Sequence, residues 1–268
     1  MLSTPPAAFS RKIVVESLSH AFDIDGRSVP VLTDVSLEVA QGEFLAIVGP
    51  SGCGKSTLLN IVSGLFPPTT GRVTVDGVPV EGINPRIGYM FARDALLPWR
   101  TSLANVAFGP ELAGEPADRR EARARDLLRL TGLAGFEGSY PSQLSQGMRQ
   151  RVSLARTLAR NPDILLMDEP FGALDTQTRL LMQEELLRIW EANQKTILFV
   201  THSVDEAVVL SDRIVVMTAR PGTVKKSVEV PFGRPRVVED LMHDVAAMEL
   251  RTDLWHLVKA EVLKGGPR

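Results

Sequence analysis

The sequence predicts an α/β fold in which short buried strands alternate with helices, and two observations carry this prediction. First, apolar runs at residues 44–48, 164–167 and 197–200 are typical of strands that are buried on both faces of a parallel sheet. Second, a helical segment from residue 177 to about 193 separates the last two runs, which gives a strand–helix–strand unit. A chain of 268 residues, 44% of them hydrophobic, is also long enough to bury a substantial core.

The segments before and after the first buried run are expected to be rich in strands. Apolar runs at residues 13–15, 29–32 and 35–39 alternate with turn residues such as Asp25-Gly26 and Gln41-Gly42. Residues 73–75 and 78–80 flank the pair Asp76-Gly77, which predicts a hairpin with a tight turn.

The middle of the chain, from about residue 100 to 160, is predicted to be rich in helices. Residues 119–130 mix charged side chains with apolar positions at 124, 127, 128 and 130, which predicts an amphipathic helix. Its arginines are interpreted as a solvated face of salt bridges in preference to a nucleic-acid site. After Pro221 the pattern weakens, and the chain is predicted to end in a helix at residues 245–263.

A glycine-rich stretch carries the first chemical motif. It fits the phosphate-loop pattern G-x-x-x-x-G-K-[ST], and it lies between the strand at 44–48 and a helix predicted at 57–62. Glycines let backbone N–H groups curl around phosphates, and the helix N-terminus adds its positive end. The lysine can reach the β- and γ-phosphates, and the serine hydroxyl can ligate Mg²⁺. The residues predicted to bind the nucleotide are Gly49, Pro50, Ser51, Gly52, Cys53, Gly54, Lys55, Ser56 and Thr57.

An acidic pair follows the buried run at residues 164–167. This position places Asp168 and Glu169 at the carboxyl end of a strand, where ligands bind in open α/β sheets. Asp168 is predicted to hold Mg²⁺ together with Ser56, and Glu169 to orient and deprotonate an attacking water. An acidic pair after a strand is more often a helix cap, but the phosphate loop upstream favours the catalytic interpretation.

The composition favours some classes of protein over others. Lys+Arg 30 against Asp+Glu 32 gives a net charge of −2, so no global basic field favours nucleic acid or anionic lipid. Cys53 is the single cysteine, which excludes an internal disulfide, and its thiol is interpreted as packing within the loop. We find neither a signal-peptide pattern nor an apolar stretch of roughly 18 residues, so membrane association is expected to come through a partner.

Several motifs in a fixed order make residues 11–220 resemble the ATP-binding cassette (ABC) ATPases. Residues 144–151 resemble the signature sequence of that family, residues 171–175 its dimer-contact loop, and His202 its switch histidine. The resemblance implies an α/β fold with a P-loop NTPase core of ABC type, a β-rich lobe and a helical subdomain at about residues 95–160. Residues 221–268 are then expected to form a C-terminal extension of helical character.

The resemblance also implies an enzyme that hydrolyses ATP with Mg²⁺ as a head-to-tail homodimer. The signature residues would close on ATP held by the other subunit. These residues are Leu144, Ser145, Gln146, Gly147 and Met148, and the dimer-contact residues are Ala173, Leu174 and Asp175. The implied catalytic residues are Lys55, Glu169 and His202. Phe22 lies where the family carries an aromatic residue that stacks on adenine, and a core phenylalanine is the alternative.

One position departs from the family pattern. The family usually carries a glutamine between the core and the helical subdomain, where it helps to bind Mg²⁺ and water and links to the transport partner. The flanking residues match, but the position holds Ala92. Alanine cannot ligate a metal or orient water. Coordination is therefore expected to rely on Ser56, Asp168 and solvent, and hydrolysis to be slower or more dependent on the partner.

Residues 96–102, the dimer-contact loop and the turn at 220–222 resemble the bacterial importers of nitrate, sulfonates and taurine. This resemblance implies integral membrane permease subunits, a periplasmic or extracellular substrate-binding protein that acts through the permease, and no nucleic-acid partner. The chain would lie peripherally on the cytoplasmic face of the inner membrane. Trp99 suits contact with the permease, although it could equally be buried packing. The alternatives are a soluble or exporter-type ABC ATPase and a cassette that binds ATP without hydrolysing it.

Overall fold

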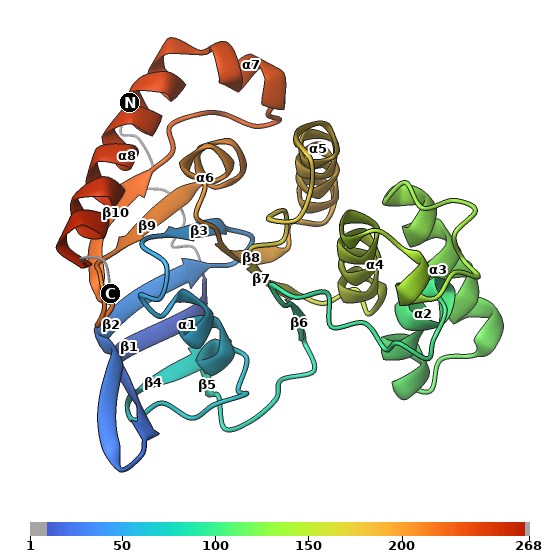
Figure 1. Ribbon diagram of the computed structural model, residues 1–268, viewed down its shortest axis with the longest axis horizontal. Helices are drawn as coiled ribbons and strands as arrows, with labels where there is room; N and C mark the ends of the chain where they lie inside the picture. The colour runs from blue at the N-terminus through green and yellow to red at the C-terminus, as the bar shows by residue number, and fades with distance from the viewer. Residues whose placement is uncertain (1–9, 266–268) are drawn as a thin grey trace, which may run out of the picture.

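The computed structural model describes residues 10–265, and two sheets organise them (Figure 1). Within these residues, a 6-stranded sheet has the order β10-β9-β3-β8-β7-β6, and its strands are parallel except for β10. Its strands are β3 (Phe44–Val48), β6 (Ile87–Met90), β7 (Ile164–Asp168), β8 (Thr196–Val200), β9 (Arg213–Met217) and β10 (Val224–Glu229).

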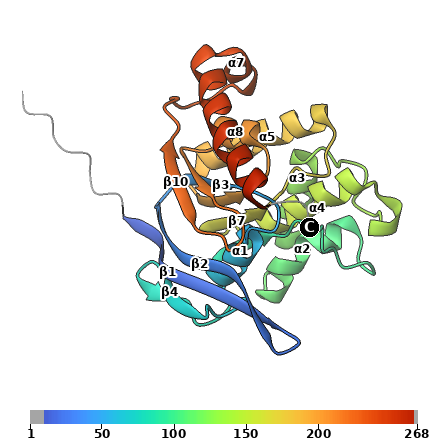
Figure 2. The same cartoon turned by 60° about the vertical axis from the view of Figure 1, so that its left-hand side comes forward.

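An antiparallel sheet lies beneath the parallel one in Figures 1 and 2. Its strand order is β2-β1-β4-β5, with β1 (Arg11–Ile24), β2 (Arg27–Ala40), β4 (Thr70–Val75) and β5 (Val78–Pro79). The hairpin predicted around Asp76-Gly77 is present, because β4 and β5 pair on either side of that turn. The predicted α/β fold is therefore confirmed, with a parallel sheet and a separate antiparallel lobe.

Strand alternation sends successive side chains of the parallel sheet into two cores. In β3, Phe44, Ala46 and Val48 face a core shared with α4 (Gln146–Ala159), α5 (Thr176–Asn193), α6 (Val204–Leu210) and α8 (Val245–Gly265). Leu45 and Ile47 face the opposite core, which α1 (Lys55–Val62) and the antiparallel sheet complete. The helix that follows the phosphate loop is thus held between the two sheets.

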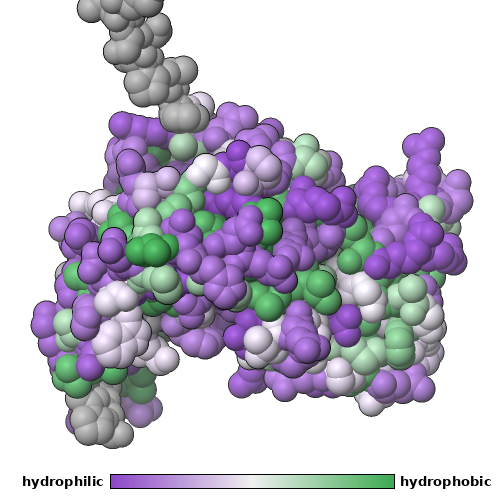
Figure 3. Space-filling model, turned by 90° about the horizontal axis from the view of Figure 1, so that it is seen from above, coloured by the Kyte–Doolittle hydropathy of each residue, from purple (hydrophilic) through white to green (hydrophobic). Residues whose placement is uncertain are grey.

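The helical subdomain has a core of its own and extends from the main body at the right of Figures 1 and 3. It contains α2 (Ser102–Leu112), α3 (Ala117–Leu130) and a short helical turn, η1 (Pro141–Gln143), and α4 joins it to the main core. Three of the five arginines of α3 form salt bridges with nearby acids: Arg123 with Glu115, Arg125 with Glu121 and Arg129 with Asp126. The predicted salt-bridged face is confirmed.

Two segments differ from the sequence prediction. The two separate apolar runs at residues 29–32 and 35–39 belong to the single strand β2. Asp34, between them, takes a positive φ, and register shifts against β1 keep the strand continuous. After residue 220, strand β10 and helix α7 (Val238–His243) precede α8, which contains the predicted helix. β10 is polar because it is an edge strand, so it lacks the apolar run that marks its neighbours.

None of the described helices is long and apolar enough to cross a membrane.

Candidate active site

The phosphate loop connects β3 to α1, and two of its glycines have backbone conformations that other residues rarely adopt. Gly52 has φ 75° and Gly54 has φ 103°, and Gly54 caps the N-terminus of α1. A Cβ atom at Gly54 would lie 2.6 Å from Leu32 Cδ2 of the antiparallel sheet. The loop can therefore reach this shape, close to that sheet, only with glycine at this position.

Lys55 lies across the loop that precedes it. Its Nζ donates hydrogen bonds to the backbone carbonyls of Gly49 at 2.8 Å and Pro50 at 2.9 Å, and the residue is buried. Cys53 is also buried, and its burial raises the pKa of the thiol, which is consistent with a packing role. The loop thus holds the Lys55 ammonium group at its centre, where it can neutralise the charge of bound phosphates.

A cavity of about 390 Å³ opens over this loop, and most of the residues predicted to bind the nucleotide line it. Phe22 lines it and is 37% exposed, so it is not a core phenylalanine. Three lining residues were missed from the sequence: Ile24, Val31 and Arg220. The predicted residues that line it are Phe22, Ser51, Gly52, Gly54, Lys55, Ser56, Thr57 and Glu169.

Asp168 and Ser56, the residues predicted to ligate Mg²⁺, bring two side-chain oxygen atoms together beside the loop. Asp168 ends β7 and is 6% exposed, and burial raises the pKa of its carboxyl group against a hydrogen bond from the Ser56 side chain. No group of three or more His, Cys, Asp or Glu residues in the described part of the chain suits a metal ion. Two oxygen ligands beside a phosphate-binding loop fit Mg²⁺, which usually completes its shell with phosphate oxygens and water.

Glu169 and His202 meet at the ends of adjacent strands. Glu169 follows β7 with φ 47°, and its Oε2 lies 3.2 Å from Nδ1 of His202, which follows β8. The backbone of Glu169 is fixed, because its N–H donates to the Val200 carbonyl and its carbonyl accepts from the Gln150 side chain. The Glu169 and His202 side chains are 37% and 60% exposed, so both remain accessible to a substrate.

A second cavity, of about 470 Å³, lies on the other side of Glu169. Of the signature residues, Gln146 lines this cavity, and Ala92 lines it beside Glu169 and His202. The dimer-contact residues Ala173, Leu174 and Asp175 complete the lining with Gly172. The structure therefore brings the signature, the dimer-contact loop, Glu169 and His202 together, whereas no signature residue lines the phosphate-loop cavity among the described residues.

The signature and the dimer-contact loop are each fixed at a helix N-terminus. Ser145 caps α4, because its hydroxyl accepts from the Met148 N–H. Asp175 caps α5, because its carboxylate accepts from the Thr178 N–H. A Cβ atom at Gly147 would lie 3.3 Å from Leu174 Cδ2, so the two segments pack closely. Leu144, the first signature residue, is buried in the core of the helical subdomain.

Comparison with known proteins identifies the family. The sequence profile of the ABC transporter family matches residues 32–172. An uncharacterised ABC transporter ATP-binding protein of Methanocaldococcus jannaschii is 51% identical over 94% of this chain and 93% of its own. A taurine import ATP-binding protein of Pseudomonas savastanoi pv. phaseolicola is 46% identical over 83% of this chain and 91% of its own.

Solved structures give the same result. A dimeric ATP-binding cassette in a post-hydrolysis state, bound to ADP and Pi, superimposes with a TM-score of 0.76 at 32% identity. The match covers 82% of this chain and 100% of that one. The family profile spans more than half of this chain, and relatives at 46–51% identity cover most of it, so the chain belongs to the ABC transporter family, as one of its ATP-binding proteins.

Proposed function

We propose that this chain hydrolyses ATP as one half of a head-to-tail homodimer and thereby drives import of a small organic anion. The observation that carries this proposal is the position of Glu169, which lines both the phosphate-loop cavity and the cavity at the signature. In a head-to-tail dimer the signature of one subunit faces ATP on the phosphate loop of the other. Glu169 then lies beside the γ-phosphate, where an attacking water must be activated.

The residues around Glu169 divide the chemistry between them. Glu169 accepts the proton of the water, and His202, which contacts it, donates a hydrogen bond to the γ-phosphate. Lys55 neutralises phosphate charge from within the loop. Ser56 and Asp168 would hold Mg²⁺, which supplies further positive charge. Rate enhancement in this scheme comes from positioning and electrostatic stabilisation of the transferred phosphoryl group.

An exposed tryptophan supports contact with a membrane permease. Trp99 is 71% exposed, so it is not buried packing. Its loop is fixed from within by Asn105, which is fully buried and bonds to the backbone of Leu97, Arg100 and Thr101. A rigidly presented aromatic side chain is a typical anchor for a partner. The partners we propose are integral membrane permease subunits and, through them, an extracytoplasmic substrate-binding protein, at the cytoplasmic face of the inner membrane.

The names of the relatives support import over the soluble and exporter-type alternatives. Several relatives at 46–50% identity are named as taurine import ATP-binding proteins. We therefore propose a solute of the taurine, sulfonate or nitrate type, with selectivity set by the permease and the binding protein. We propose no nucleic-acid partner, because the net charge of the chain is −2.

The test is affinity capture from native membranes. Glu169→Gln should slow hydrolysis and hold the closed dimer on its permease in ATP-Mg²⁺ and mild detergent. Mass spectrometry is expected to find a membrane-spanning permease in about 2:2 proportion. Adding Trp99→Ala should weaken this capture, whereas adding Trp255→Ala, at an α8 tryptophan that is 50% exposed, should not. Capture of soluble partners alone would contradict the import proposal.

A further inference from the structure

A buried carboxylate close to His202 has no role in the scheme above. Glu206 lies in the first turn of α6, and its side chain is 7% exposed. Burial raises the pKa of its carboxyl group, while a hydrogen bond from Thr201 and the charge of Arg179 act in the opposite direction. Buried carboxylates are retained at a cost in stability, so the contacts of this one call for an explanation.

On one side, Glu206 holds the loop that carries His202. Its Oε2 accepts a hydrogen bond of 2.5 Å from the hydroxyl of Thr201, the residue before His202. The same hydroxyl accepts from the N–H of Ser203, the residue after His202. Glu206 thus fixes both neighbours of the histidine.

On the other side, Glu206 faces an arginine that holds the dimer-contact loop. Arg179, on α5, donates through Nη2 to the backbone carbonyl of Leu174 at 2.9 Å. Its Nε lies 3.8 Å from Glu206 Oε1, which is too long for a hydrogen bond. This nitrogen is buried and has no hydrogen-bond partner among the described residues. A buried unsatisfied donor beside a carboxylate favours any movement that shortens the contact.

We propose that Arg179 and Glu206 are positioning residues that transmit the position of the dimer-contact loop to His202. The proposal rests on the dimeric ATPase function proposed above. When a second subunit closes on the dimer-contact loop, the loop shifts the Leu174 carbonyl that Arg179 holds, and Arg179 closes onto Glu206. Glu206 then holds Thr201 and the adjoining histidine in place against Glu169. Hydrolysis is thereby coupled to dimer closure within each subunit.

The test is a double-mutant cycle on steady-state ATP hydrolysis. Glu206→Gln keeps the shape of the side chain and a hydrogen-bond acceptor for Thr201 but loses the charge that attracts Arg179. We expect kcat to fall by about tenfold and KM for ATP to change by less than about twofold. In a His202→Ala background the same substitution should change the residual rate by less than about twofold, because the histidine through which Glu206 acts is absent.

The matched control is Glu43→Gln, at a glutamate whose side chain is 13% exposed and which is paired with Arg213. It should leave kcat unchanged. An equal loss from Glu206→Gln in both backgrounds, or no loss in either, would overturn the proposal. If the Glu206→Gln variant does not fold, Arg179→Gln replaces it in the same double-mutant cycle, because the Arg179 side chain is 36% exposed. A loss of kcat that disappears in the His202→Ala background is again expected, and an equal loss in both backgrounds, or none, would overturn the proposal. Absence of turnover in the unsubstituted chain would instead contradict the proposed ATPase function itself.

Discussion

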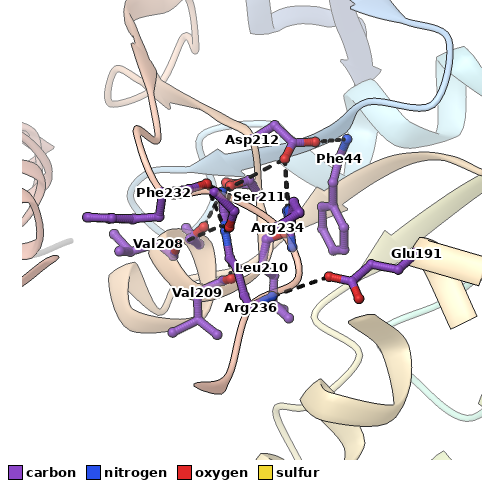
Figure 4. A network of polar contacts seen from close by, with 12 residues as sticks. Phe44, Glu191, Val208, Val209, Leu210, Ser211, Asp212, Phe232, Arg234 and Arg236 are labelled. Carbon is purple, nitrogen blue, oxygen red and sulfur yellow. Dashed lines mark hydrogen bonds and ion pairs between the residues drawn. The ribbon is translucent and has the colours of Figure 1, made fainter. Parts of the chain in front are cut away.

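The two edges of the parallel sheet use polar side chains in opposite ways. At the carboxyl edge, β3, β7 and β8 lead into the phosphate loop, Asp168-Glu169 and His202. At the amino edge, where β3 and β9 begin, Figure 4 shows a network around two arginines of the C-terminal segment, Arg234 and Arg236. Both edges gather charges, but only the first faces the cavities that we assign to ATP and the second subunit.

Arg236 illustrates the amino edge. Its side chain is 2% exposed, and burial lowers its pKa to about 10, so it stays charged at neutral pH. Nη1 donates to the carbonyls of Val209 at 3.1 Å, in the last turn of α6, and Ser211 at 2.7 Å, the C-cap of that helix. Nη2 donates to the Phe232 carbonyl at 2.9 Å. The cation therefore caps a helix C-terminus and ties the C-terminal segment to the sheet.

Arg236 and the Glu169–His202 pair differ in how their polar atoms are satisfied, although Nη1 of the neighbouring Arg234 is buried without a hydrogen-bond partner among the described residues. Every nitrogen of the Arg236 guanidinium donates to backbone carbonyls. Glu169 and His202, by contrast, are partly exposed, and Glu169 is held at a positive φ. Groups already satisfied by the protein hold the fold together, whereas accessible groups on a strained backbone are available to a substrate.

Among substitutions that test this difference between the two edges, the largest effect on ATP turnover is expected at Glu169. We predict that Glu169→Gln lowers ATP turnover by about 10³-fold, because the amide cannot take a proton from water. ATP binding should change by only a few-fold, and thermal unfolding should be unaffected, because the substitution keeps the side chain's size. Turnover and calorimetric binding measured on one preparation check both parts. A variant that retained more than about a tenth of the turnover would rule out Glu169 as the base.

At the amino edge we predict the reverse pattern. Arg236→Met should lower the free energy of unfolding by about 3 kcal/mol, because several buried carbonyls lose a charged donor. Turnover per folded molecule should stay unchanged. Urea unfolding and active-site-normalised kinetics measure the two effects. Arg188→Met, at an arginine whose side chain is 65% exposed, is the control and should change stability by less than about 0.5 kcal/mol. Loss of turnover without loss of stability would contradict the division between the edges.

Gly222 links the C-terminal half of the chain to the phosphate loop. Its N–H donates to the Val31 carbonyl at 2.8 Å, and an added Cβ atom would lie 2.0 Å from the Cys53 carbonyl oxygen. We predict that Gly222→Ala displaces the loop, raises KM for ATP by about tenfold and costs about 2 kcal/mol of stability. Gly233→Ala, where a Cβ atom would meet nothing within 4 Å, should leave KM unchanged. Equal KM values for the two variants would show that Gly222 does not support the loop.

The sequence predicted those parts of the site that depend on local pattern. The phosphate loop and the acidic pair follow buried apolar runs, and their chemistry requires particular residues at fixed spacing. Arg179 and Glu206 could not be found in this way, because they meet only when α5 and α6 pack together. Arg236 was missed for the same reason, since its carbonyl partners come from residues more than 20 positions away as well as from its own segment. β10 was missed because an edge strand needs no apolar run.

The smallest predicted effect concerns the departure at Ala92, which lines the cavity beside Glu169 and His202. A glutamine there would add an amide that can orient the attacking water and contribute an oxygen to Mg²⁺. We predict that Ala92→Gln raises basal turnover by about two- to fivefold. Ala92→Leu, which adds similar bulk without a polar group, should not raise it. ATP turnover of the isolated chain at saturating Mg²⁺ separates the two variants. If turnover is unchanged or lower in Ala92→Gln, then alanine does not limit hydrolysis, and the water must be oriented by the groups already around Glu169.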